Sequence, residues 1–241
     1  MKKTIALLYF WLLCYVAFSQ ENSTSTDRPS YFALSVGPSI PLQDFKSTDG
    51  KNANAGFAKN GRKKDILWGK ELNNTHWGVT GLLRIHKNPI DEGELALMAK
   101  TVYSSFDYSI SAKEWNVYTL MAGAYYRIPV SRKLTVIPKA MVGLAYIYSP
   151  EINAVPFNNS VHVASSNMES SHTLTTSYLF GIGLKNNLFH RIVLISNVDI
   201  LGAFPTFNDM KTIHGNGTTI FRTKSPTILS FNYGIGIGYT F

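Results

Sequence analysis

Apolar and polar residues alternate along most of this chain, and the pattern is clearest over its last nine residues. Glycine or threonine occupies every second position there, and the positions between carry a set of large apolar residues: Tyr233, Ile235, Ile237, Tyr239 and Phe241. Such a strand presents an unbroken apolar face to one environment and a nearly bare face to the other. Lipid covers an apolar face of this kind, so the pattern predicts a membrane-spanning β-strand.

The same alternation predicts eight strands, with connections that differ in length. The strands are expected near residues 30–38, 76–86, 94–105, 115–128, 134–148, 172–184, 190–202 and 227–241. Short turns are expected at 87–93, 129–133 and 185–189, and mostly longer polar loops at 39–75, 106–114, 149–171 and 203–226. Short turns on one side and long loops on the other are typical of outer-membrane barrels. We therefore predict an all-β fold, a single eight-stranded antiparallel up-and-down transmembrane β-barrel over residues 30–241.

The start of the chain is typical of a secretory signal. Lys2 and Lys3 precede an apolar run over residues 5–18, and small residues at Ala17 and Ser19 suit cleavage before Gln20. The run is shorter than the roughly 20 residues that a spanning helix needs. Cys14 lies inside the run behind Leu13, which argues against a lipid anchor. We predict a signal peptide over residues 1–19, a short N-terminal segment over 20–29, and a mature protein without cysteine.

Composition agrees with a membrane barrel. Charged residues make up 16% of the chain, below the roughly 25% of soluble domains. The formal charge is +8, and losing Lys2 and Lys3 with the signal leaves +6. The basic residues are scattered and form no compact basic helix, so we do not expect a nucleic-acid partner.

Two short motifs carry a resemblance to a known family. Residues 37–45 read Gly-Pro-Ser-Ile-Pro-Leu-Gln-Asp-Phe, and Ala55–Lys59 reads Ala-Gly-Phe-Ala-Lys. With the barrel pattern, they make the chain similar to the small OmpA- or OmpX-like outer-membrane barrels described as "porin family" proteins. The resemblance implies a place in the cell outer membrane and contact with its lipid and lipopolysaccharide. It also implies that the barrel-assembly machinery reads the apolar set of the last strand.

Several charged residues are expected to face the barrel interior, because a Lys or Arg facing lipid at mid-depth costs about 2–4 kcal/mol. The expected inward charges are Arg84, Glu94, Lys100, Arg127, Lys139 and Asp199, with Asn197 and Asn232 beside them. One interpretation is an ion-conducting constriction. The other, which we favour, is a salt-bridged plug, since eight strands leave room for little beyond their own side chains.

Catalytic and metal sites are weakly supported. None of the six histidines is followed two positions later by serine, as a His-x-Ser hydrolase site would require. Asp107 and His172 could share the rim of an omptin-like protease, but two residues are thin support. His162 and His172 have no neighbouring cluster at metal-ligand spacing. We predict a non-enzymatic protein with no catalytic residue, cofactor or metal.

The first long loop is the strongest candidate for a surface function. Arg62, Lys63 and Lys64 would lie among lipopolysaccharide phosphates if residues 39–75 form an external loop. The alternative is an ordinary solvated basic loop. The expected role is structural or surface-interacting through the external loops, with an unidentified protein partner there. The alternative is a narrow pore for small solutes or ions.

Overall fold

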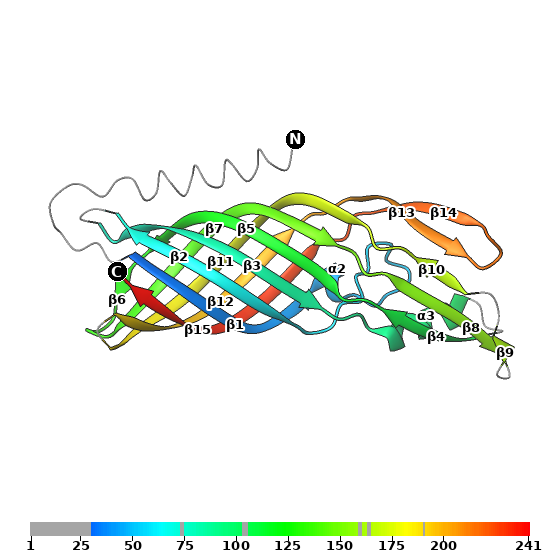
Figure 1. The fold of residues 1–241 in the computed structure, drawn as a ribbon, viewed down its shortest axis with the longest axis horizontal. Helices are drawn as coiled ribbons and strands as arrows, with labels where there is room; N and C mark the ends of the chain where they lie inside the picture. Colours follow the sequence, from blue (N-terminus) through cyan, green and yellow to red (C-terminus); the bar gives the residue numbers. More distant parts are fainter. Residues whose placement is uncertain (1–29, 73–74, 103–105, 159–160, 163–164, 190) are drawn as a thin grey trace.

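A closed β-barrel forms the body of the molecule, as Figure 1 shows. The computed structural model describes residues 30–72, 75–102, 106–158, 161–162, 165–189 and 191–241. The predicted signal peptide and the whole of the segment expected at residues 20–29 lie outside the described residues. The described wall has eight long antiparallel strands: β1 (Ser30–Leu42), β2 (Gly61–Glu71), β3 (Trp77–Asn88), β5 (Trp115–Tyr126), β7 (Leu134–Tyr148), β11 (His172–Phe189), β12 (Ile192–Ala203) and β15 (Ile228–Thr240). Because β1 pairs with β15, and β7 with β11, the sheet closes and the predicted fold class is confirmed.

The C-terminal strand completes the wall. Tyr31 lies opposite Thr240, and Ser30 and Phe241 exchange two backbone hydrogen bonds of 2.9 Å. Its apolar set points outward, with exposed fractions of 41–64% at Tyr233, Ile235, Ile237, Tyr239 and Phe241. A Cβ at Gly236 would lie 2.0 Å from the carbonyl oxygen of Leu34, so only glycine fits there.

The barrel has two different ends. At the turn end lie Ser30, Phe241, the ends of β2 and β3, the ends of β11 and β12, and residues 127–133 with the short β6 (Ile128–Pro129). The loop end carries the connections at 43–60, 89–114, 149–171 and 204–227. Shorter connections at one end and longer ones at the other are therefore found, but two of the expected short turns were wrong. Residues 87–93 lie at the loop end, and residues 185–189 belong to β11.

A second sheet extends the molecule beyond the loop end (Figure 1). Its strands run in the order β14 (Thr219–Lys224), β13 (Phe207–His214), β10 (Ser166–Met168), β8 (Ile152–Asn158) and β4 (Asp107–Ala112), and β9 (Val161–His162) pairs with β8. Here β8 follows β7, β10 precedes β11, and β13 and β14 lie between β12 and β15. We call this sheet, with helix α3 (Glu92–Val102), the platform. It continues one side of the barrel wall outward.

The outer surface of the barrel is apolar. Its exposed large side chains include Val36, Leu83, Leu120, Leu144, Phe180 and Ile200. Aromatic rings gather near the turn end, where Trp77 meets Tyr126 edge to face with centroids 5.1 Å apart. An apolar band bordered by aromatic residues matches the hydrocarbon layer of a membrane. Among the described residues, no helix is long and apolar enough to cross a membrane.

Two strand assignments from the sequence were wrong. Residues 94–105 were expected to form a barrel strand, but α3 begins at Glu92 and lies in the platform. The strand that takes its place in the wall is β2, which was assigned to the first long loop. The number of strands was right because one false strand replaced one missed strand.

The local chemistry explains both errors. The side chain of Asp91 accepts a hydrogen bond of 3.3 Å from the backbone N–H of Glu94, which caps α3, and the helix formers Leu95 to Ala99 follow. The outward side of β2 carries Arg62, Lys64 and Lys70, so the apolar alternation that marks the other strands is broken there.

Lysine substitutions at Ile66 and Leu97 test this correction. Ile66 is 40% exposed on the lipid face of β2, and Leu97 is 59% exposed on α3. We expect Ile66→Lys to lower the free energy of unfolding by about 2 kcal/mol, because it places a charge in the apolar band. Leu97→Lys should change it by less than about 0.5 kcal/mol. Urea titration of the barrel in lipid vesicles measures both, and equal effects would contradict the placement of β2.

Candidate functional site

The barrel interior is built in layers. An apolar cluster fills the part nearer the turn end: Tyr31, Ala33, Leu67, Leu82, Met121, Tyr125, Ile137, Met141, Leu179, Val193, Ile195 and Leu201. A second apolar cluster fills the loop end and is shared with the platform. Along β3 the inward residues run from Leu82 through Arg84 and His86 to Asn88, so a polar layer lies between the two clusters.

Arg84 is the centre of the polar layer. Its guanidinium donates to Asp65 at 2.7 and 3.0 Å and to Asp199 at 2.6 and 2.8 Å. All three side chains are at most 1% exposed. Two bidentate pairs on one guanidinium use the planar fork of arginine fully, and they leave neither carboxylate without a countercharge.

This arrangement crosses the bore. The wall order is β11, β12, β15, β1, β2, β3, β5, β7, and β7 pairs back to β11, so β3 and β12 are four strands apart in a ring of eight. Arg84 stands on β3 and Asp199 on β12, which places them on opposite walls. The ion pair between them therefore spans the lumen.

Other buried groups complete the layer. The ammonium group of Lys63 contacts Asp65, and the Ser35 hydroxyl donates to the same carboxylate at 3.2 Å. Lys139 donates to the Asn197 side chain at 3.0 Å. Three cations then stand against two carboxylates in this layer.

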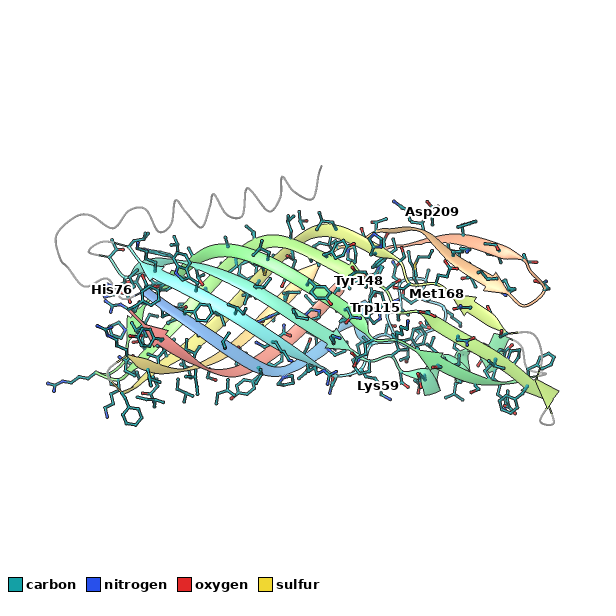
Figure 2. The ribbon with its side chains drawn as sticks, in the orientation of Figure 1. Lys59, His76, Trp115, Tyr148, Met168 and Asp209 are labelled. Carbon is teal, nitrogen blue, oxygen red and sulfur yellow. The ribbon has the colours of Figure 1, made fainter. Side chains whose placement is uncertain are left out.

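Aromatic side chains close the lumen at the loop end. Phe45, from the short helix α2 (Gln43–Lys46), meets the Trp115 ring edge to face at 5.7 Å, and Phe207 meets Trp115 at 5.9 Å. All three are at most 3% exposed. The Trp115 indole donates to the Gly56 carbonyl at 2.9 Å, which holds residues 43–60 in the mouth. Figure 2 shows Trp115 where the barrel meets the platform.

The turn end is also occupied. Tyr31 and Tyr125 are buried there with their rings 6.3 Å apart. The Lys185 ammonium lies over the Tyr31 ring at 5.3 Å from its centroid. Arg127 and Glu71 form an ion pair of 3.4 Å nearer to solvent.

The structure places the expected lumen charges in different surroundings. Arg84, Lys139 and Asp199 are buried inside, as are Asn197 and Asn232. Arg127 lies at the turn end rather than in the polar layer. Glu94 and Lys100 were wrongly placed in the lumen: both are exposed on α3, and Lys100 pairs with Asp107 at 2.6 Å.

The basic loop expected at Arg62, Lys63 and Lys64 is part of the barrel wall. All three stand on β2, where alternation sends Lys63 inward and its two neighbours outward to the surface. Sequence reasoning therefore missed Lys63 and Asp65 as lumen residues. The available signal was the inward series Lys63, Asp65, Leu67, Gly69 and Glu71, whose period of two is intact.

The described histidines do not form a catalytic arrangement. His76 stacks on Tyr126 at the turn end, and His172 lies against Tyr146 and Tyr148 at the start of β11. Asp107 is engaged by Lys100 on the platform instead. His214 Nδ1 lies 3.3 Å from the Ser166 hydroxyl, but these are cross-strand neighbours, and no described contact gives His214 a carboxylate partner. Among the described residues, no group of three or more His, Cys, Asp or Glu could hold a metal.

The platform is fastened to the barrel mouth. Met210, Met168 and Ile152 pack against the same cluster as Trp115. Lys224 at the end of β14 donates to the Ala55 carbonyl at 3.0 Å. Burial lowers the pKa of Lys224, and the charge of Arg222 lowers it further.

The chain was compared with known families, curated proteins and solved structures, and one solved structure supports the fold. No family model and no curated protein matches the chain. A major outer membrane protein of Thermus thermophilus has a TM-score of 0.53 at 10% identity, covering 88% of this chain and 99% of its own. Ail of Yersinia pestis has a TM-score of 0.47 at 16% identity, covering 90% and 100%. Neisserial surface protein A has a TM-score of 0.44 at 11% identity, covering 88% and 97%.

Replacing Arg84 tests the polar layer. Arg84→Met leaves Asp65 and Asp199 as buried carboxylates without their main partner, so we expect the free energy of unfolding to fall by about 3–5 kcal/mol. Adding Asp199→Asn should restore part of the loss, because it removes the carboxylate that has lost Arg84 while Asp65 keeps its contact with Lys63. Lys100→Met, which breaks an exposed pair, should cost less than about 1 kcal/mol. Unfolding in vesicles measures the series, and a cost for Arg84→Met no larger than that for Lys100→Met would rule out the crossing ion pair.

Proposed function

We propose that this protein is a closed, non-conducting barrel of the outer membrane that presents its platform for surface interactions. The observation that carries the proposal is the ion pair from Arg84 to Asp199, which joins opposite walls inside the lumen. Apolar clusters lie on both sides of it. A barrel whose lumen is filled in this way would act through its exposed platform and would not pass solutes or ions.

The apolar band and the fold support the location. A closed antiparallel barrel with an exposed apolar face, short turns at one end and long loops at the other is the form that spans outer membranes. By this logic the turn end faces the periplasm, and the platform faces the outside. The signal expected at residues 1–19 agrees with export.

The platform supports the surface role. Its six strands stand beyond the apolar band, and the edge strand β14 carries Phe221 with 60% of its surface exposed. An unpaired sheet edge and an exposed aromatic ring are features that partners bind. A protein partner is therefore proposed at the platform rather than at the turns.

A narrow pore is disfavoured by the residues it would use. A continuous path lined by Lys100, Arg127 and Lys139 would need all three in the lumen. Lys100 lies on the platform, and Arg127 lies at the turn end. An enzyme is disfavoured because the Ser166–His214 pair has no acid partner among the described contacts.

Planar-bilayer recording tests the closed lumen. The purified barrel, shown to be folded by its heat-dependent mobility in electrophoresis, should produce no stable channels because ion pairs and rings fill its bore. Insertion is checked separately by flotation with vesicles. Reproducible channels of constant conductance would refute the closed lumen and favour the pore.

Shortening the platform tests the surface role. Replacing residues 212–220 with Asn-Gly, together with Phe221→Ser, removes the exposed ring and the outer part of β13 and β14. It leaves Lys211 and residue 221 paired across a two-residue turn and keeps Phe207 and Met210 in the apolar cluster at the loop end. Cells displaying the intact protein should attach to at least one of immobilised gelatin, laminin or polystyrene, and cells with the shortened protein should lose that attachment. Equal attachment at equal surface levels would argue against the platform.

A further inference from the structure

His86 is buried inside the barrel without a hydrogen-bond partner. The residue is 0% exposed, and neither Nδ1 nor Nε2 meets a donor or an acceptor among the described residues. A neutral imidazole normally donates from one ring nitrogen and accepts at the other, so leaving both unused is unfavourable. A protonated imidazole has two N–H donors and needs two acceptors. The surroundings of His86 therefore supply nothing that would hold a proton on the ring.

The charges around His86 also oppose a proton. Lys63 lies directly opposite His86 on β2, and Arg84 is the preceding inward residue on β3. The carboxylates of Asp65 and Asp199 are already bound by these cations. The polar layer holds three cations for two carboxylates, so a proton on His86 would add a fourth positive charge with no partner. A buried charge without a partner is strongly unfavourable.

The other elements near His86 bring neutral side chains. On β5, Val117 pairs with His86. On β1, the Ser39 hydroxyl donates to Asn88, the next inward residue on β3, at 3.4 Å. The short helix α2 contributes Phe45 as its buried residue. Because these groups carry no negative charge, a protonated His86 would have to be stabilised by water.

Water reaching His86 from the loop end has to pass the apolar cluster in the mouth. Val117, which pairs with His86, belongs to that cluster together with Trp115. Met168 and Met210 of the platform pack in the same cluster. Water can therefore solvate His86 from this side only if the cluster opens. Protonation of His86 is thus coupled to the packing of the mouth and to the contacts that hold the platform.

We propose that His86 is a proton-sensitive switch that controls the mouth of the barrel. While the ring is neutral, the mouth stays dry and the platform is held in place. When acid protonates the ring, water enters from the loop end and the contacts between the mouth and the platform loosen. The inference rests on the proposed closed lumen, and it adds regulation of that lumen and of the platform by the pH outside the cell.

The direction of the pH dependence follows from the number of protons bound in each state. The closed state carries no proton on His86. The open state carries one on a hydrated ring, which titrates near about pH 6.5. Below that pH, acid therefore raises the ratio of open to closed molecules, by up to about tenfold per pH unit. Above that pH, the ratio no longer depends on His86.

Hydrogen exchange of the Trp115 indole N–H measures the opening, because this group donates to the Gly56 carbonyl at 2.9 Å in the mouth. In the expected mature chain from Gln20 onward, Trp68→Phe with Trp77→Phe leaves Trp115 as the single tryptophan, so its indole signal in NMR spectra is unique. Exchange is divided by that of free tryptophan at the same pH, which removes the intrinsic pH dependence. From about pH 6.5 to about pH 4.5, we expect protection in detergent micelles to fall at least about tenfold.

Two neutral replacements of His86 test its role. His86→Gln and His86→Leu should each reduce the fall in protection to less than about twofold, because neither side chain takes up a proton. The matched control is His172→Gln, which changes an exposed histidine and should behave as the unsubstituted protein. Heat-dependent mobility shows that each variant is folded. Asp65 and Asp199 remain in every variant, so a fall that persists in both His86 variants would assign the effect to other groups and overturn the switch.

The ring signals of His86 give a measurement that does not depend on variants. In the protein that retains His86, its ring carbon signals should shift over the same pH range in which the Trp115 indole loses protection. A shift without loss of protection would overturn the coupling between proton and mouth. Protection that is equal at both pH values would also overturn the proposal.

Planar-bilayer recording at neutral pH separates this inference from the proposed function. Stable channels at neutral pH, together with protection that falls in acid only when His86 is present, would refute the closed lumen and leave the switch in place. Absence of channels, together with protection that does not change with pH, would leave the closed lumen in place and overturn the switch.

Discussion

The crossing ion pair of Arg84 is the constraint on which the interior depends. A buried guanidinium is tolerable only when carboxylates meet it from fixed positions, and here they come from the neighbouring strand at Asp65 and from the opposite wall at Asp199. The walls must therefore stay at the separation that these side chains span. The long charged side chains also require small residues beside them. A Cβ at Gly234 would lie 2.6 Å from the ammonium nitrogen of Lys63. The inward glycines leave room for long charged side chains in a narrow bore.

The platform is packed firmly against the barrel. Its Met168 and Met210 pack on the same cluster as Trp115 and Ile147 of the barrel, so the two sheets share a core rather than a hinge. Flexible loops lose conformational entropy when they become ordered on binding, and this loss lowers their affinity for a partner. A platform already fixed by a shared core avoids most of that loss. Under the proposed function, the residues that fill the mouth both close the lumen and hold the platform in place.

Much of this fold could be predicted from the sequence, and the failures have local causes. Strands such as β7 and β15 have apolar outward faces, so alternation identified them, and it also placed Arg84, Lys139 and Asp199 inside. It failed at β2 because Arg62 and Lys64 stand on the face that is apolar in other strands. It failed at α3 although Asp91 and Glu94 carried a helix-start signal. Once β2 was missed, Asp65 could not be recognised as a partner of Arg84, because pairing across a barrel depends on the complete order of strands.

Strand β2 carries basic residues on both of its faces, and the two faces meet different surroundings. Lys63 points inward, where Asp65 compensates it within the protein, whereas Arg62 and Lys64 point outward past the end of the apolar band. Protein carboxylates cannot fill that second role, since only Glu114 approaches among the described contacts, at 3.8 Å. The described contacts therefore leave an excess of positive charge on this outward face of β2. The inward charge is compensated within the protein and the outward charges lie beyond Ile66, so the same two residues that break the apolar alternation also explain why sequence reasoning missed β2.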